Sequence, residues 1–222
     1  GVTVNCPLYD VLDEAITESK HICDAHYQIT PEVTIAARHQ QDDDDDDDDE
    51  DDEESPSITL VRPWVHHSIT EILKNAMAAT IDHHYQAAIN NESTTSTSLL
   101  QQSLPPIEIE LVQDAEFWHI LVRDQGMGLS TPHDDDDAFV FASSSANKRW
   151  DRLDEQQSYA MVRSPLQSLG VGLTTSRWMM QHFGGNVQLA NNNNNINNDE
   201  SSNGCTATIS LCRDDTLLEY QP

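Results

Sequence analysis

The stretch Glu71-Ile72-Leu73-Lys74-Asn75-Ala76-Met77 decides the fold, because it lies inside the longest apolar pattern of the chain that has helical spacing. Apolar residues recur every three or four positions from about Val65 to Tyr85, which predicts an amphipathic helix. Glu71 and Asn75 are one turn apart, so their side chains would project from the same side of that helix. Two glycine-rich stretches follow, Asp124-Gln125-Gly126-Met127-Gly128 and, about 45 residues further on, Leu169-Gly170-Val171-Gly172-Leu173.

The helix carries two residues whose chemistry suits a bound nucleotide. The amide oxygen of Asn75 is a hard, neutral ligand for Mg²⁺, which typically takes few protein ligands beside phosphates and water. The carboxylate of Glu71 could act as a general base toward a hydroxyl or water that attacks a γ-phosphate. A Glu and an Asn one turn apart are also common on a solvated helix face, and the helix alone leaves that alternative open.

The two glycine-rich stretches suit the two ends of the same nucleotide. Asp124 follows a buried strand predicted over 117–122, and its carboxylate could accept from the exocyclic amine of adenine. Gly126 and Gly128 would let the backbone approach a flat ligand. Gly170-Val171-Gly172-Leu173 opens a predicted helix, and a helix N-terminus favours phosphate. Taken singly, an ordinary strand-to-loop turn and a plain capped helix explain these stretches equally well.

The remaining pattern predicts an α+β two-layer sandwich, with a mixed, mostly antiparallel sheet and helices on one face. A first helix follows Pro7, and a last helix runs from Thr174 or Thr175 to Phe183, ended by two glycines. The short strands 33–35 and 58–61 are expected to meet as a hairpin around an acidic loop. Further strands are expected at 107–111, 117–122, 187–189 and 207–211.

We expect one domain over residues 1–222, interrupted by low-complexity inserts at about 40–56, 91–104 and 191–203. Residues of about 129–168 lack periodicity and are predicted to form a flexible lid over the ATP site.

The composition is acidic, with a formal net charge of −28. Residues 42–54 are thirteen consecutive acids and Asp134 to Asp137 add four; without them the net charge is −11. Such a surface disfavours nucleic acid as a principal partner. Four cysteines without a CxxC pair suit a reducing compartment, and no apolar run is long enough to span a membrane. The sequence begins at Gly1 rather than Met, so we expect a piece of a longer protein.

In order and spacing, these motifs resemble the ATP-binding domain shared by gyrase, histidine kinases and mismatch-repair ATPases. Within that superfamily the chain is most similar to the mitochondrial kinases of the pyruvate and branched-chain 2-oxoacid dehydrogenase complexes. The similarity lies in the helix Glu71–Thr80 and in the segments Cys23–Tyr27, Gly170–Arg177 and Phe183–Leu189. It covers nearly the whole chain outside the inserts.

The resemblance implies an ATP- and Mg²⁺-dependent protein serine kinase of the mitochondrial matrix, which phosphorylates and inactivates a dehydrogenase component. It implies Glu71 as general base, Lys74 as its polarising neighbour and Asn75 as the magnesium ligand. Asp124, Gly126 and Gly128 would contact adenine, and Gly170, Val171, Gly172 and Leu173 would lie near the phosphates. Cys205 stands where these kinases carry an adenine-binding Thr, so Thr206, one residue later, is the candidate for that role.

The implied partners are the dehydrogenase substrate, the lipoyl-bearing core of the complex through segments outside this chain, and a second copy in a homodimer. Two other functions stay open. One is a histidine kinase of the two-component type, which needs a phosphoacceptor His on a dimerisation helix. The other is an ATP-binding regulatory module without catalysis.

Overall fold

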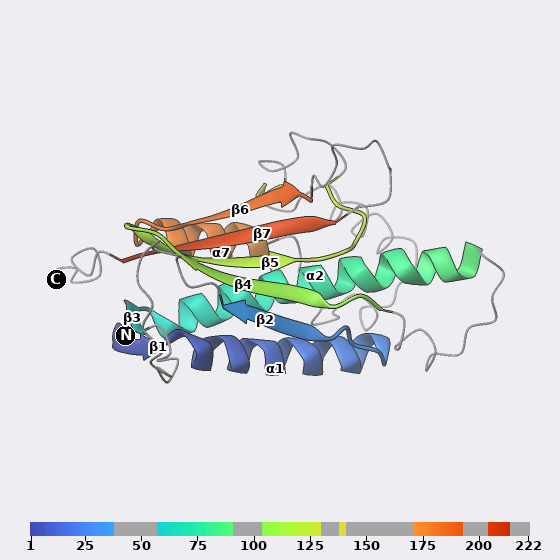
Figure 1. Cartoon of the computed structure of the whole chain (residues 1–222), viewed down its shortest axis with the longest axis horizontal. Coiled ribbons are helices and arrows are strands. Elements are labelled where there is room, and N and C mark those ends of the chain that lie inside the picture. Colours follow the sequence, from blue (N-terminus) through green and yellow to red (C-terminus); the bar gives the residue numbers. More distant parts are fainter. Residues whose placement is uncertain (38–56, 91–103, 130–137, 141–170, 193–203, 214–222) are drawn as a thin grey trace, which may run out of the picture.

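A five-stranded sheet with helices on one face forms the body of the protein (Figure 1). This computed structural model describes residues 1–37, 57–90, 104–129, 138–140, 171–192 and 204–213. The strand order is β2-β4-β5-β7-β6, with β2 parallel to β4 and every other pair antiparallel. The predicted α+β two-layer sandwich is therefore confirmed. The sheet strands are β2 (Val33–Ala37), β4 (Ile107–Gln113), β5 (Phe117–Arg123), β6 (Asn186–Asn191) and β7 (Cys205–Cys212).

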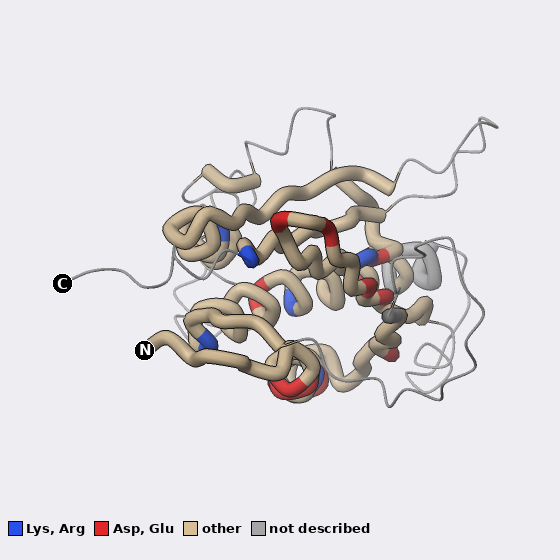
Figure 2. The backbone as a smooth tube through the Cα atoms, turned by 60° about the vertical axis from the view of Figure 1, so that its left-hand side comes forward, with Lys and Arg blue, Asp and Glu red and all other residues tan. Residues whose placement is uncertain are grey.

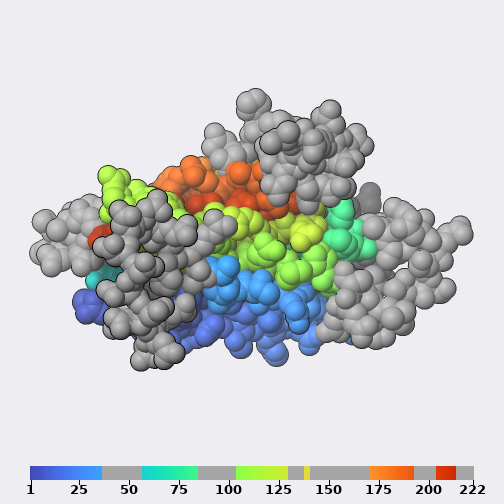
Figure 3. Space-filling view, viewed as in Figure 1, coloured from blue at the N-terminus to red at the C-terminus, as the bar shows by residue number. Residues whose placement is uncertain are grey.

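Alternation of apolar and polar residues determines which face of the sheet is buried. On each of the three central strands, alternate residues are apolar and at most 6% exposed, namely Ile107, Ile109 and Leu111 on β4, Ile120 and Val122 on β5, and Ala207, Ile209 and Leu211 on β7. Their register pairs Ile109 with Val122 and Ile120 with Ile209, so the apolar side chains of neighbouring strands share one face. The strands succeed one another from light blue through green to red and orange in Figure 3, with no described helix in front of them. The helices therefore cover the opposite, apolar face.

The first helix, α1 (Leu8–Tyr27), begins directly after Pro7, as predicted. Leu8, Val11, Leu12 and Ala15 form its buried side. It ends at Tyr27. The following residue, Gln28, adopts a left-handed conformation with φ 59° and donates its backbone N–H to Asp24 O at 2.8 Å.

The central helix α2 (Arg62–Asn90) is longer than predicted and contacts α1, the sheet and α7 (Gly172–Gln181). Because it has neighbours on several sides, even polar residues such as Ser68, Glu71 and Lys74 are buried. Trp64 lies near the start of α2. The centroid of its ring is 5.2 Å from the ring centroid of Phe183, a residue just beyond the end of α7.

The expected hairpin between residues 33–35 and 58–61 is wrong. β2 pairs in parallel with β4, whereas β3 (Ser57–Leu60) pairs with β1 (Thr3–Pro7) in a separate two-stranded sheet. Alternating patterns predict strands but not their partners, and β1 was not predicted because Cys6 is its only buried residue. Along the chain, the acidic insert therefore follows a strand of one sheet and precedes a strand of the other, and it falls outside the described residues.

Candidate functional site

The two glycine-rich stretches approach one side of α2. That side carries Glu71, Asn75 and Ala79, which are spaced one turn apart. A methyl group at Gly172 would collide with the Glu71 carboxylate, 2.9 Å from its Cδ. A methyl group at Gly126 would lie 2.7 Å from Ala79 Cβ. The two glycine-rich stretches therefore pack against the same side of α2, one turn on either side of Asn75. Asn75 is half-buried at this point of the helix.

Glu71 and Lys74 form a buried ion pair beside this point. Lys74 Nζ lies 2.5 Å from Glu71 Oε1, and both side chains are almost fully enclosed. The other carboxylate oxygen, Glu71 Oε2, is buried without a hydrogen-bond partner among the described residues. This oxygen is the one that faces Gly172. A buried carboxylate oxygen without a partner is costly in a purely structural role, and it suits an acceptor for a ligand's proton.

The helix α7 points its first turn toward the same region. It begins at Gly172, and the side chain of its N-cap residue, Val171, donates or accepts no hydrogen bond. The first backbone N–H groups of a helix lack intrahelical partners, which makes this end suitable for phosphate oxygens. Leu173 is half-buried against the core. The predicted site residue Gly170 lies outside the described part of the chain.

Asp124 directly follows β5 and is buried, at 7% exposure. Its Oδ1 accepts from the backbone N–H of Gly126 at 2.9 Å and of Cys205 at 3.2 Å. Burial raises the pKa of Asp124 above its ordinary 3.8, and the two backbone hydrogen bonds oppose that shift. Among the described residues, Oδ1 accepts both of the hydrogen bonds made to this side chain.

Thr206, the residue that the sequence suggests as a contact of adenine, lies on β7. The register of β5 and β7 pairs it with Arg123. The preceding residue, Cys205, accepts from the backbone N–H of Asp124 at its carbonyl oxygen and donates its own N–H to Asp124 Oδ1. Residues opposite each other share a sheet face, so Thr206 and Asp124 project to different faces. The Thr206 hydroxyl donates to Asn192 Oδ1 at 2.5 Å. Any effect of Thr206 on the Asp124 loop passes through that amide.

A short described piece of the predicted lid, residues 138–140, contacts α7. Phe139 is 7% exposed, and the guanidinium carbon of Arg177 lies 3.9 Å from the centre of its ring. Thr174 Oγ1 donates to Phe139 O at 2.7 Å. These contacts place one point of the predicted lid on the helix that begins at Gly172. The rest of the lid lies outside the described residues.

Acidic residues prevail over basic ones along the described backbone, as Figure 2 shows. No group of three or more His, Cys, Asp or Glu side chains gathers there as a metal cage. No helix in the described ranges is both long and apolar enough to cross a membrane.

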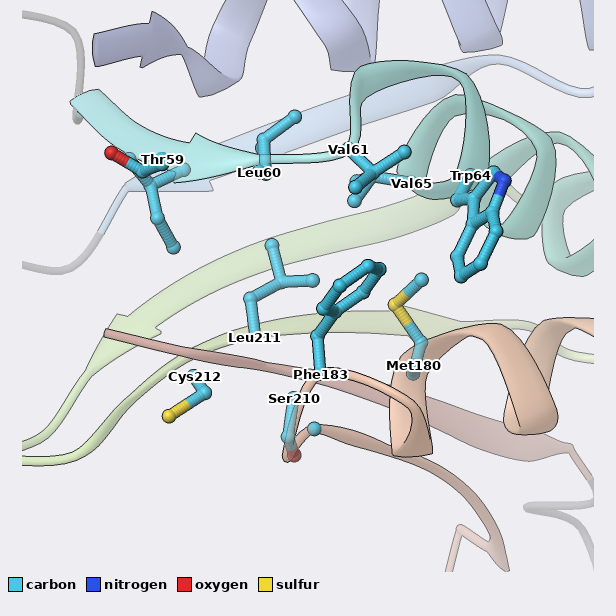
Figure 4. Close-up of a pocket in the computed structure, with 12 residues that line it drawn as sticks. Thr59, Leu60, Val61, Trp64, Val65, Met180, Phe183, Ser210, Leu211 and Cys212 are labelled. Atoms are coloured by element: carbon cyan, nitrogen blue, oxygen red, sulfur yellow. The ribbon is translucent and has the colours of Figure 1, made fainter. Parts of the chain in front are cut away.

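A small apolar pocket lies elsewhere, at the start of α2 (Figure 4). Trp64, Met180 and Phe183 line it together with β3 and the end of β7. It shares no lining residue with the site around Asn75, so the two are separate features.

Sequence reasoning missed three contributors to the site. Asn191 and Asn192 bond to the Asp124–Leu129 loop, although they look like the start of a low-complexity insert. The alternation of apolar and polar residues stops at Leu189, so the sequence held no signal for these contacts. Phe139 was hidden because residues 129–168 lack periodicity.

Comparison with known proteins confirms the resemblance. The chain is 27% identical over 189 residues to the mitochondrial pyruvate dehydrogenase (acetyl-transferring) kinase isozyme 4 of Homo sapiens, covering 85% of this chain and 38% of the relative. It is 23% identical to isozyme 1 of Rattus norvegicus, over 85% of this chain and 36% of the relative. The mitochondrial kinase of Drosophila melanogaster is 26% identical over 83% of this chain and 38% of its own length.

No model of a known protein family matches the chain. The similarity to the three kinases covers most of this chain, but the chain spans little more than a third of the length of each kinase.

Proposed function

We propose that this chain is the ATP-binding part of a protein serine kinase acting on a 2-oxoacid dehydrogenase complex. One observation carries the proposal. Asn75 lies on the one side of α2 where Gly172 contacts Glu71 and Gly126 contacts Ala79, so two distant motifs meet on either side of a single amide. The similarity to mitochondrial pyruvate dehydrogenase kinases supports the same assignment.

In this proposal each part of the nucleotide has its own contact. Asp124 Oδ2 accepts from the adenine amine, because Oδ1 already receives two backbone N–H groups. Gly126 and Gly128 form the wall beside the base. The phosphates lie at the N-terminus of α7, near Gly172 and Leu173.

Asn75 Oδ1 binds the magnesium ion. When bound, Mg²⁺ neutralises charge on the triphosphate, and it needs few protein ligands because phosphate and water oxygens supply the others. The residues present fit this arrangement, because Asn75 lies between the two glycine contacts and Glu71 Oε2 is a buried acceptor without a partner among the described residues.

Glu71 is the general base of the proposed reaction. Its Oε2 takes the proton of the attacking serine hydroxyl, which makes that oxygen a better nucleophile toward the γ-phosphorus. Lys74 binds Oε1 and so keeps the carboxylate oriented with Oε2 toward the site. The displaced ADP leaves with the electrons of the broken bond between phosphorus and the bridging oxygen.

The proposed protein substrate is the dehydrogenase component of such a complex in the mitochondrial matrix. Docking to the lipoyl-bearing core and homodimer formation would use parts of the protein beyond this chain, since the chain spans little more than a third of its relatives.

A Glu71→Gln substitution tests the proposal in the full-length protein. Gln keeps the volume and an acceptor for Lys74 but cannot take a proton. We expect ATP affinity within about threefold of wild type, and phosphoryl transfer to the dehydrogenase reduced by at least about 10²-fold. Glu108→Ala, an exposed change on β4, is the matched control. Full residual transfer by the Glu71→Gln variant would refute the base.

The chemistry of the product separates the alternatives. Acid-stable phosphoserine supports the proposal, whereas acid-labile phosphohistidine would indicate a histidine kinase. ATP binding by the full-length wild type without transfer to any dehydrogenase component would indicate a regulatory module.

A further inference from the structure

Two neighbouring amides at the end of β6, Asn191 and Asn192, bond to the loop that carries Asp124, Gly126 and Gly128. They are the last described residues before the Asn-rich segment. Both are half-buried, and each directs its side chain to a backbone group of this loop. Together they contact the loop at Asp124 and at Leu129, which are its two ends.

Asn191 fixes the far end of the loop with a pair of hydrogen bonds. Its Oδ1 accepts from Leu129 N at 2.5 Å, and its Nδ2 donates to Leu129 O at 3.1 Å. The preceding Gly128 has φ 72°, and a methyl group there would lie 2.8 Å from Asn191 Oδ1. The amide and the glycine therefore fit each other closely, and the two hydrogen bonds hold the end of the loop against β6.

Asn192 fixes the near end. Its Nδ2 donates to Asp124 O at 2.8 Å, and its Oδ1 accepts from Thr206 Oγ1. Its backbone N–H donates to Gly204 O at 3.0 Å. Asn is a short side chain that offers a donor and an acceptor together, so a hydrophobic or acidic residue cannot reproduce both bonds.

We propose that Asn191 and Asn192 are positioning residues for recognition of the adenine base. This inference rests on the proposed function, because it takes the Asp124 loop as the adenine wall. A loop containing two glycines loses much conformational entropy when it binds a ligand in one shape. Fixing both ends beforehand reduces that loss, and so increases affinity for the base that the loop reads. Thr206 contributes through Asn192.

The inference predicts an effect on base recognition that general loosening of the fold would not produce. Adenine presents an amine to Asp124, whereas guanine presents a carbonyl at the corresponding position. Loss of the amides should therefore weaken ATP much more than GTP, which shares the sugar, the triphosphate and the magnesium. The preference for ATP over GTP is thus the readout.

The test is calorimetric titration of Mg·ATP and Mg·GTP into the full-length protein and into Asn191→Ala, Asn192→Ala and the double variant. We expect ATP affinity about tenfold lower in each single variant, and GTP affinity within about threefold. Asn186→Ala, an amide at the other end of β6, is the matched control and should bind both nucleotides like wild type. Thermal unfolding monitors folding of each variant.

If the Ala variants do not fold, Asn192→Asp provides the decision, because it keeps an acceptor for Thr206 and replaces only the donor to Asp124 O. An unchanged ATP preference, or an equal loss for both nucleotides, would overturn the inference while leaving the proposed function intact. Failure of the wild type to bind either nucleotide would refute the proposed function, and the inference with it.

Discussion

Gly172 and Glu71 are complementary at the scale of single residues. The helix α7 approaches α2 so closely that the Glu71 carboxylate occupies the space where a side chain at position 172 would be. Gly126 makes an equally close approach to the same helix, but its neighbour is Ala79 rather than a functional group. The two glycines thus allow the same physical contact at two points. Only the contact at Gly172 involves the proposed base.

A double-mutant cycle tests this contact directly. Gly172→Ala should destabilise the protein by about 1–3 kcal/mol, because the methyl group collides with the carboxylate. In a Glu71→Ala background the carboxylate is absent and the methyl group no longer collides with it. The destabilisation caused by Gly172→Ala should then be smaller by about 0.5–3 kcal/mol. Urea unfolding of the four proteins gives the coupling energy.

Gly126→Ala is the matched control for that cycle. Its methyl group meets Ala79, so its cost should add to that of Glu71→Ala within about 0.5 kcal/mol. Additive costs for Gly172→Ala and Glu71→Ala would show that the carboxylate does not lie against α7.

At the scale of elements, the turn between β4 and β5 is stabilised by a network that spans three strands. Asp114 Oδ1 accepts from the backbone N–H groups of Glu116 and Phe117, and its Oδ2 lies 2.9 Å from His119 Nε2. The other ring nitrogen of His119 lies 3.0 Å from Ser210 Oγ on β7. The hydrogen bond from His119, followed by those from the two backbone N–H groups, lowers the pKa of Asp114 from 3.8 to about 2.

The sign of the resulting pH dependence follows from linkage. A carboxylate whose pKa is lower in the folded state binds fewer protons there than in the unfolded chain. Its stabilisation is complete above pH 3.8 and is lost as the pH falls toward about 2. At pH 5, Asp114→Asn should therefore have a lower free energy of unfolding than wild type. Between pH 4 and pH 2, that free energy should fall less in Asp114→Asn than in wild type.

Urea midpoints at pH 5, 4, 3 and 2.5 measure this difference. Asp13→Asn, which removes an exposed carboxylate from α1, should retain the wild-type pH profile over that window. Parallel profiles for wild type and Asp114→Asn would contradict the assigned role of the turn.

The sequence predicts helices and strands better than it predicts which strands pair with each other. Periodicity reports which face of a residue run is buried, so α1, α2, β4, β5 and β7 are predicted at nearly their observed places. Pairing depends on contacts between distant segments, which explains the wrong hairpin of β2 with β3. The site follows the same rule. The motifs predict Glu71, Asn75 and Asp124, whereas the amide contacts of Asn191 and Asn192 depend on the fold.

At the scale of the whole molecule, the fold brings together segments that lie far apart in the chain. The central helix α2 contacts α1, α7 and strands β5 and β7, so residues near positions 75, 124 and 172 become neighbours. The predicted inserts fall between elements, and loop closure costs little more for a long connection than for a short one. Long acidic and Asn-rich segments are therefore compatible with an intact site.

The central claim is that Asn75 binds the magnesium of a bound nucleotide. Calorimetric titration of ATP, with and without Mg²⁺, into wild type and Asn75→Ala tests it most directly, with Gln188→Ala as an exposed amide control on β6. We predict that Mg²⁺ strengthens ATP binding in wild type and in the control. Asn75→Ala should lose that gain while its thermal unfolding stays close to wild type. An Asn75→Ala protein that binds Mg·ATP as tightly as wild type would contradict the account.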